Sequence, residues 1–170
     1  LYNRTGDSFL LTLMDKIRNL TEDWTTAFLT GSMGDNHGVN VAEGFKMPPV
    51  WYQRSNDTRD RDAFMEGHYN AMRLHGQPHY LPSCTEFLAG KSSLQGVEFC
   101  SVVDRIFSDG VAMIVLGEPK IGDITERIAF NALPGCLSKP LRQHQYYEAP
   151  NQAQSIYGPK GIYGQDYEDG

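Results

Sequence analysis

Apolar residues recur at helical spacing along most of the chain. In the first such stretch, Phe9, Leu13 and Ile17 share one face, as the ~3.6-residue period of an amphipathic helix requires. Similar patterns run through residues 38–54, 59–74, 97–116 and 121–133. Proline interrupts the hydrogen-bond ladder of a helix, so the Pro48–Pro49 pair is expected to kink or restart the second pattern. Strand patterns are scarce, and the sequence therefore predicts an all-α array of antiparallel helices.

A short motif recurs between these predicted helices. It stands at residues 2–7 (YNRTGD), at 52–57 (YQRSND) and, in shortened form, at 116–118 (LGE). Gly6, Asn56 and Gly117 suit the left-handed conformation that ends a helix. Asp7 and Asp57 can cap the helix that follows. The copies lie about 50 to 60 residues apart, a helical-hairpin period, and hairpins of this kind stack as an open solenoid or close into a toroid.

Composition and charge narrow the classes of function. Fifteen Lys and Arg against 21 Asp and Glu give a net charge of −6, so nucleic acid, which requires a basic face, is not expected as a partner. No apolar run approaches the ~20 residues of a membrane helix, so no membrane partner is expected either. Cys84, Cys100 and Cys136 are too few for a disulfide scaffold, which leaves free thiols, a single bridge or metal ligands.

The two ends indicate that these 170 residues are part of one larger domain. The sequence begins with Leu1 in what resembles the tail of a helix, without a targeting segment. It ends in an irregular Gly- and Tyr-rich tail over residues 156–170. We therefore expect residues 1–170 to form a partial catalytic domain, whose partner is the rest of that domain. Such a part is also expected to expose an apolar face.

Polar and aromatic residues gather between the predicted helices. Four of the five histidines lie there, at positions His37, His75, His79 and His144. Alternate loops of a toroid fall on one rim and would converge on one cavity. Imidazole, amide and carboxylate groups match sugar hydroxyls, and aromatic faces pack on sugar rings. This composition is typical of a carbohydrate site.

Several segments resemble one known family. GVEFC at 96–100 is similar to the Gly-x-Glu-[Thr/Leu]-Cys signature of the β-L-arabinofuranosidases, glycoside hydrolase family 127 and its relatives. ERIAFNA at 126–132 resembles the family's Glu-Arg-x-x-[Phe/Tyr]-Asn-Ala block. Further matches are HGVN at 37–40, HGQPH at 75–79, HQY at 144–146 and NQ at 151–152. The resemblance thus extends over nearly the whole chain.

The resemblance implies an (α/α)6 toroid that carries a retaining glycosidase acting on a carbohydrate. In this family a cysteine nucleophile is held on zinc by a Glu-x-Cys pair and two adjacent downstream cysteines. The pair corresponds to Glu98 and Cys100, with Phe99 departing from the family at the middle position. Cys84 and Cys136 are isolated and match neither downstream cysteine. The resemblance therefore implies half of a zinc site and a nucleophile that lies outside this chain.

The spacing of Glu98 and Cys100 constrains their chemistry independently of the family. A thiolate and a carboxylate are suitable zinc ligands, and zinc keeps the thiol deprotonated. Two residues apart on a helix they would diverge by about 200°, but in an extended segment they point to one side. Joint binding of a metal ion therefore requires an extended or irregular entry into the next helix. The alternative is an inert, buried Cys100 and a Glu98 that favours the helix N-terminus.

Glu86 is the second carboxylate that the resemblance singles out. It begins EFLAG at 86–90, and in the family the corresponding glutamate resembles the general acid/base. That role needs a carboxyl held in a partly apolar site, which Phe87 and Leu88 could provide. The alternative is a solvated loop glutamate.

Three further residues are candidates for substrate binding. His37 and Tyr146 resemble the family's sugar-contacting histidine and tyrosine, and His79 is the third candidate. The alternatives are a histidine that stabilises its own turn, ordinary aromatic packing of Tyr146, and the bracing of a turn by His75 and His79.

Three functions remain open at this point. The first is a glycosidase acting on L-arabinofuranose or a related plant sugar, and the second is a non-catalytic carbohydrate-binding or scaffold protein of the same fold. The third is another (α/α)6 enzyme, such as a sugar epimerase. Such enzymes use His or Asp chemistry without a Glu-x-Cys pair, so the triplet Glu98–Cys100 counts against this class. Localisation is also open, because sequons at Asn3, Asn19 and Asn56 fit secretion, whereas free thiols fit a reducing compartment.

Overall fold

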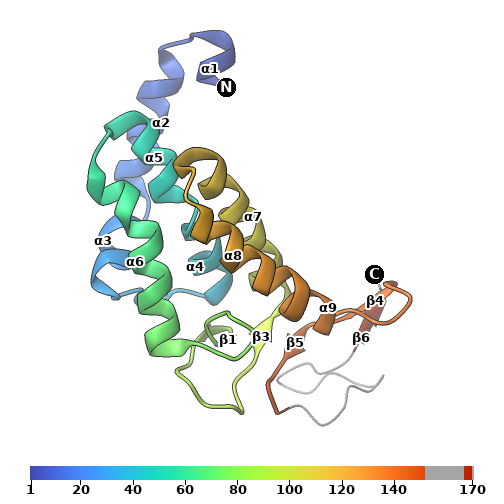
Figure 1. The fold of residues 1–170 in the computed structure, drawn as a ribbon. Coiled ribbons are helices and arrows are strands. Elements are labelled where there is room, and N and C mark those ends of the chain that lie inside the picture. The colour runs from blue at the N-terminus through green and yellow to red at the C-terminus, as the bar shows by residue number, and fades with distance from the viewer. Residues whose placement is uncertain (152–166, 170) are drawn as a thin grey trace.

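The computed structural model describes residues 1–151 and 167–169, and it is mainly helical, as the sequence predicts (Figure 1). The helices are α1 (Tyr2–Thr5), α2 (Phe9–Leu20), α3 (Trp24–Thr30), α4 (Gly38–Gly44), α5 (Met47–Ser55), α6 (Thr58–His75), α7 (Phe99–Leu116), α8 (Pro119–Arg127) and α9 (Leu133–Gly135), with a π-helical turn (Ile128–Ala132) before α9. The strands are β1 (Cys84–Thr85), β2 (Phe87–Leu88), β3 (Val97–Glu98), β4 (Gln143–Gln145), β5 (Tyr147–Glu148) and β6 (Tyr167–Asp169).

The predicted junctions end three helices. Gly6, Asn56 and Gly117 follow α1, α5 and α7 in the left-handed conformation, with φ of 70°, 54° and 63°. Asp57 accepts a hydrogen bond from a backbone N–H in the first turn of α6, and Asp7 does the same at the start of α2. These ends were predictable because each depends on one or two neighbouring residues.

The proline pair has the predicted effect. Pro48 and Pro49 stand in the first turn of α5, where the missing N–H groups have no helical partner to lose. The pattern over 38–54 accordingly divides into α4 and α5, with Phe45 and Lys46 between them.

The all-α expectation misses one helix and all of the strands. α3 has a sequence signal in its caps, since the Asp23 carboxylate accepts from the Thr26 N–H at 3.1 Å and Gly31 ends the helix. Val97 and Glu98 form a strand and not a first helical turn, because they pair with β5. The described residues do not show a closed toroid.

The strands form two small sheets. The larger has the order β2-β1-β3-β5, with β1 parallel to β3 through Cys84 and Val97, and β3 antiparallel to β5 through Glu98 and Tyr147. The tail predicted at 156–170 lies outside the described residues except for β6, which pairs antiparallel with β4. The larger sheet therefore links the end of α6 to the start of α7.

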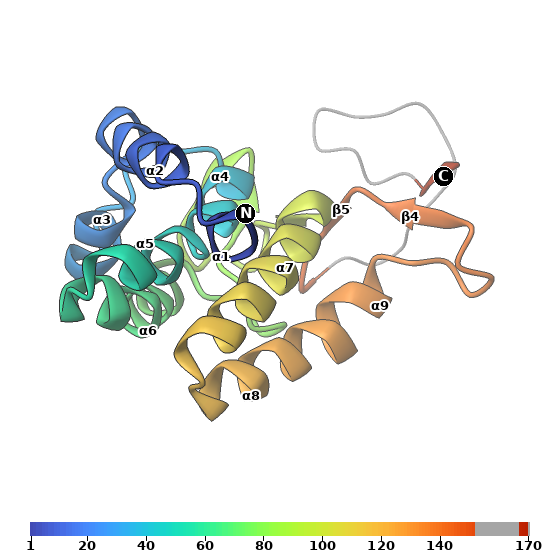
Figure 2. The same ribbon diagram turned by 90° about the horizontal axis from the view of Figure 1, so that it is seen from above.

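Two apolar clusters hold the helices together. The first contains Trp24, Phe28, Phe45, Trp51 and Phe64, and the rings of Phe28 and Phe45 stack with centroids 4.3 Å apart. The second lies nearer the strands and contains Leu81, Val97, Val102, Ile124, Ile128, Ala132 and Cys136. Figures 1 and 2 show α7 and α8 side by side as a hairpin next to α3–α6, with the strands at one end of the helices.

A buried ion pair within α7 also contacts residues outside this helix. Arg105 and Asp109 are 1% and 0% exposed, and Arg105 Nε donates to Asp109 at 2.6 Å. The guanidinium also lies 3.7 Å from the ring centroid of Phe45 and donates from NH2 to His68 Nδ1 at 3.3 Å. Because a buried charge needs both a counter-ion and hydrogen bonds, this arrangement satisfies Arg105 on each side.

Several large apolar side chains on the helices are exposed. Phe9 on α2 is 60% exposed, and Phe107 and Ile114 on α7 are 58% and 85% exposed. Among the residues that the structure describes, none of the helices has the length and apolarity that crossing a bilayer demands.

Candidate functional site

Polar side chains from separate segments meet at the strand end of the helices. His37 precedes α4, Glu86 lies between β1 and β2, and Glu98 lies where β3 meets α7. The backbone fixes this meeting, because the N–H of the residue after His37 donates to the Glu86 carbonyl at 2.8 Å. These three residues and their neighbours Cys84, Cys100, Tyr146 and Tyr147 form the carboxylate cluster.

Glu86 stands at the tip of a tight hairpin. It adopts a φ of 76° between paired strands, a left-handed conformation that costs a non-glycine residue about 1–2 kcal/mol. Its side chain is 63% exposed. The apolar surroundings expected from Phe87 and Leu88 do not enclose it, because Phe87 is itself 54% exposed. Glu86 is therefore the accessible carboxylate of the cluster.

His37 lies between the two carboxylates. Its Nε2 is 2.8 Å from Glu98 Oε2 and 3.3 Å from Glu86 Oε2. This nitrogen is buried, yet it forms no hydrogen bond with any described residue. Neither oxygen lies in the direction in which an N–H of the ring would point. The ligand atoms of one metal ion also lie about 3 Å apart without a hydrogen bond between them, because their lone pairs point at the metal ion.

Glu98 is the buried carboxylate of the cluster, with 1% of its side chain exposed. Tyr147 donates its hydroxyl to Glu98 Oε1 at 3.1 Å. The thiols of Cys84 and Cys100 lie 3.6 and 3.8 Å from Glu98 Oε2. Buried carboxylates require a cation or strong donors, and His37 is the one basic side chain that contacts Glu98 among the described residues.

Glu98 and Cys100 meet the geometric condition derived from their spacing. Glu98 is extended, with φ −73° and ψ 142°, and Cys100 is the second residue of α7. This change of conformation places both side chains on one side, as a shared metal ion requires.

Both thiols of the cluster are held in the neutral form. Burial raises the pKa of Cys84 to about 12. The pKa of Cys100 is also raised, first by burial and then by the charge of Glu98, although a hydrogen bond with Tyr146 opposes the shift. A bound metal ion would reverse this preference, because it favours the thiolate.

Two adjacent tyrosines complete the cluster. The Tyr146 hydroxyl lies 3.6 Å from Cys100 Sγ, and the Tyr147 hydroxyl also donates to Glu86 Oε1 at 3.3 Å. Burial raises the pKa of both phenols, so they act as hydrogen-bond donors at neutral pH. Sequence reasoning missed Tyr147, because its role follows from pairing with Glu98 across β3 and β5, a contact between distant segments.

His79 lies apart from the carboxylate cluster. Its Nε2 is 3.8 Å from Glu148 Oε1, and the Cys136 thiol donates to Glu148 Oε2 at 3.2 Å. Glu148 follows Tyr147 in β5, so successive side chains point to opposite faces and Glu148 faces away from the cluster with its partner Val97. The structure therefore brings His37, Glu86, Glu98, Cys100 and Tyr146 together, but not His79.

The cluster has the donor set for a divalent metal ion. Nitrogen of His37 and one oxygen each of Glu86 and Glu98 lie within 4.8 Å of one another. Histidine and carboxylates suit zinc, and a nearby thiol adds a softer ligand. The residues present thus fit zinc, with Cys100 as a further donor beside Glu98.

Comparison with known proteins does not assign this chain to a family. No family model, no curated protein and no solved structure matches this chain.

Proposed function

We propose that this chain is the part of a retaining glycoside hydrolase that carries the acid/base and half of a zinc site. The substrate would contain L-arabinofuranose or a related plant sugar, and the parent domain would be an (α/α)6 toroid. The observation that carries the proposal is the meeting of His37, Glu86, Glu98, Cys100 and Tyr146 in one cluster. These are five of the six site residues predicted from sequence, and the sixth, His79, lies apart from the cluster.

Burial gives the two carboxylates different roles. Glu86 is accessible, so it can reach the leaving-group oxygen of a sugar and transfer a proton to it. Glu98 is enclosed and contacts His37 and two thiols, which suits a metal ligand and not a group that touches substrate. Because Glu86 is open to water, the proposal requires the bound sugar to cover it.

Zinc would supply one property here, the stabilisation of a thiolate at neutral pH. In this chain Glu98 and Cys100 would hold it. The resemblance places the nucleophilic cysteine outside residues 1–170, so the chain alone is expected to bind sugar without hydrolysing it. His37 and Tyr146 would then orient the sugar hydroxyls through an imidazole and a phenol.

The test is hydrolysis of an aryl β-L-arabinofuranoside, with zinc and reductant, by this chain and by the longer protein that contains it. We expect turnover only with the longer protein, and a large loss of kcat after Glu86→Gln. Glu66→Gln, which alters an exposed carboxylate on α6, is the matched control. Absence of turnover by the longer protein would contradict the glycosidase proposal. Turnover by this chain that disappears in Cys100→Ser would instead place the nucleophile within it.

A further inference from the structure

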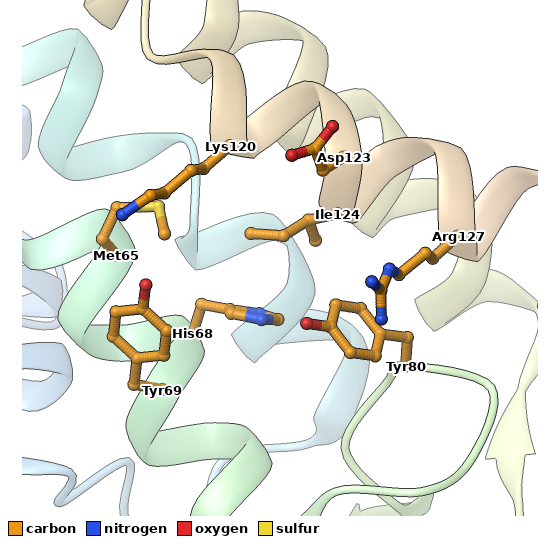
Figure 3. A pocket seen from close by; sticks show the side chains of 8 residues that line it. All are labelled: Met65, His68, Tyr69, Tyr80, Lys120, Asp123, Ile124 and Arg127. Atoms are coloured by element: carbon orange, nitrogen blue, oxygen red, sulfur yellow. The ribbon is translucent and has the colours of Figure 1, made fainter.

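A second set of polar side chains surrounds a cavity of about 140 Å³ between α6 and α8 (Figure 3). Its lining residues are Met65, His68, Tyr69, Tyr80, Lys120, Asp123, Ile124 and Arg127. None of them belongs to the carboxylate cluster. Since each water of the liquid takes ~30 Å³, the cavity has room for about five waters, enough for a small ligand group.

Two cations on α8 border this cavity without a counter-ion. Lys120 and Arg127 lie two turns apart on one side of the helix, and neither forms an ion pair with any described residue. Arg127 lies 4.7 Å from the ring centroid of Tyr80, over its face. Stacking fixes the plane of the guanidinium and leaves its N–H groups free to bind at the edge. Asp123, between the two cations on α8, is the one carboxylate in the lining.

His68 contributes a donor to the floor of the cavity. It is 2% exposed, and its Nδ1 faces Arg105 NH2 at 3.3 Å. Arginine can only donate, so Nδ1 accepts and the proton of the neutral ring is on Nε2. Burial and the charge of Arg105 lower the pKa of His68 to about 3, which keeps the ring neutral. No described residue accepts from this Nε2–H, and the ring faces the cavity (Figure 3).

Two phenols add further donors. In Figure 3 the hydroxyls of Tyr69 and Tyr80 point into the cavity from opposite walls, and neither hydroxyl is hydrogen-bonded to a described residue. Tyr80 has a φ of 74°, a conformation that costs a residue with a side chain about 1–2 kcal/mol. Its ring nevertheless lies between His68 and Arg127, and the centroids of the Tyr80 and His68 rings are 5.4 Å apart. Such strain is commonly kept where it orients a functional group.

We propose that this cavity binds a small ligand through an oxyanion, either a phosphate or a carboxylate group. Arg127 and Lys120 neutralise the charge, and the planar edge of Arg127 matches two oxygens of either group. The hydroxyls of Tyr69 and Tyr80 and the ring N–H of His68 donate to the remaining oxygens. Asp123 accepts from a hydroxyl on the body of the ligand. This site stands on its own contacts and does not depend on the proposed glycosidase function.

The experiment titrates the 170-residue chain with inorganic phosphate, D-glucose 6-phosphate and D-glucuronate at constant ionic strength, followed by calorimetry. We expect saturable binding at one site for at least one of these probes, and their relative affinities separate a phosphate from a carboxylate ligand. Lys120→Met and Arg127→Met should each weaken binding about tenfold or more, because each removes a charge-assisted hydrogen bond. Asp123→Asn should strengthen the binding of inorganic phosphate, because it removes a like charge.

The matched control is Lys91→Met, which removes one exposed positive charge from a loop that does not line the cavity. It should leave the affinity unchanged, and circular dichroism checks that each variant keeps its helices. The proposal is overturned if none of the three probes binds saturably. It is also overturned if Arg127→Met binds as tightly as the unaltered chain, or if Lys91→Met loses as much affinity as Lys120→Met.

Discussion

Glu98 and Tyr147 face each other across the β3–β5 pair, and the Tyr147 hydroxyl donates to the buried Glu98 carboxylate at 3.1 Å. The same hydroxyl lies 3.3 Å from Glu86 Oε1. One side chain from near the end of the described chain thus contacts both carboxylates of the cluster.

Tyr147→Phe should destabilise the chain by about 1–3 kcal/mol, because it takes a donor from a buried carboxylate. Tyr146→Phe is the matched control. Among the described residues its hydroxyl forms a hydrogen bond only with the Cys100 thiol, at 3.6 Å, and it should matter less. Urea unfolding measures both variants. An unchanged stability of Tyr147→Phe would show that Tyr147 acts through ring packing and not through its hydroxyl, because phenylalanine keeps the ring.

Gly38→Ala should destabilise the chain by about 2 kcal/mol or more. A Cβ at Gly38 would lie 1.7 Å from Cys84 Sγ, so the thiol beside Glu98 would have to move. Gly110→Ala on α7 meets nothing within 4 Å and should instead stabilise by about 0.5–1 kcal/mol, because alanine favours a helix interior. Thermal unfolding distinguishes these opposite signs, and a neutral Gly38→Ala would contradict the close approach of α4 to β1.

Glu148→Gln should change the pH dependence of stability. Burial raises the pKa of Glu148 from 4.5 to about 7, although the Cys136 thiol opposes the shift. Between these values the folded state binds more protons than the unfolded state, so this carboxyl makes stability fall as pH rises. The variant lacks that fall, and its stability relative to the unaltered chain should increase by up to about 2–3 kcal/mol from pH 4.5 to 7.5.

His79→Gln tests the opposite contribution beside it. Burial lowers the pKa of His79 from 6.5 to about 4, so His79 makes stability rise as pH increases over that range. The variant should lose this rise, in contrast to Glu148→Gln. Urea unfolding at several pH values measures both slopes. Parallel slopes in the two variants would indicate that His79 and Glu148 form an ion pair and do not meet as neutral groups.

Zinc should bind this chain weakly. The proposed ligands in this chain are Glu98 and Cys100, and the two adjacent cysteines of the glycosidase family that the motifs resemble have no counterpart here. We expect zinc to be lost on dialysis, and Glu98→Gln to weaken what binding remains, whereas Glu118→Gln at the start of α8 should not. Metal analysis after dialysis gives the result. Stoichiometric zinc that survives dialysis would show that the site is already complete.

Local features of the fold were predictable from sequence. The left-handed ends at Gly6, Asn56 and Gly117 and the cap at Asp57 depend on one residue and its immediate neighbours. The restart at Pro48 likewise follows from a missing N–H group. α3 was missed because its seven residues are too short for the apolar period to be distinctive.

Much of the candidate site was also predictable, because short motifs marked its residues. Sequence spacing required an extended Glu98 before a helical Cys100, and the structure has that conformation. The roles of these residues remain proposals, whereas their meeting is observed. His79, the third candidate for substrate binding, lies apart from this cluster, because the alternation of side chains along β5 turns its neighbour Glu148 to the other face. Its role in substrate binding stays a prediction.

Helix boundaries, capping residues and the set of chemically interesting side chains were determined by the sequence itself, since each is a property of a few adjacent residues. Tertiary structure alone decided which of those side chains meet. Strands of two or three residues carry no periodic signal, and they exist here because segments such as β3 and β5, some 50 residues apart, supply each other's hydrogen bonds. The same holds for the cavity between α6 and α8, where Tyr80 and Arg127 become neighbours only after the helices pack.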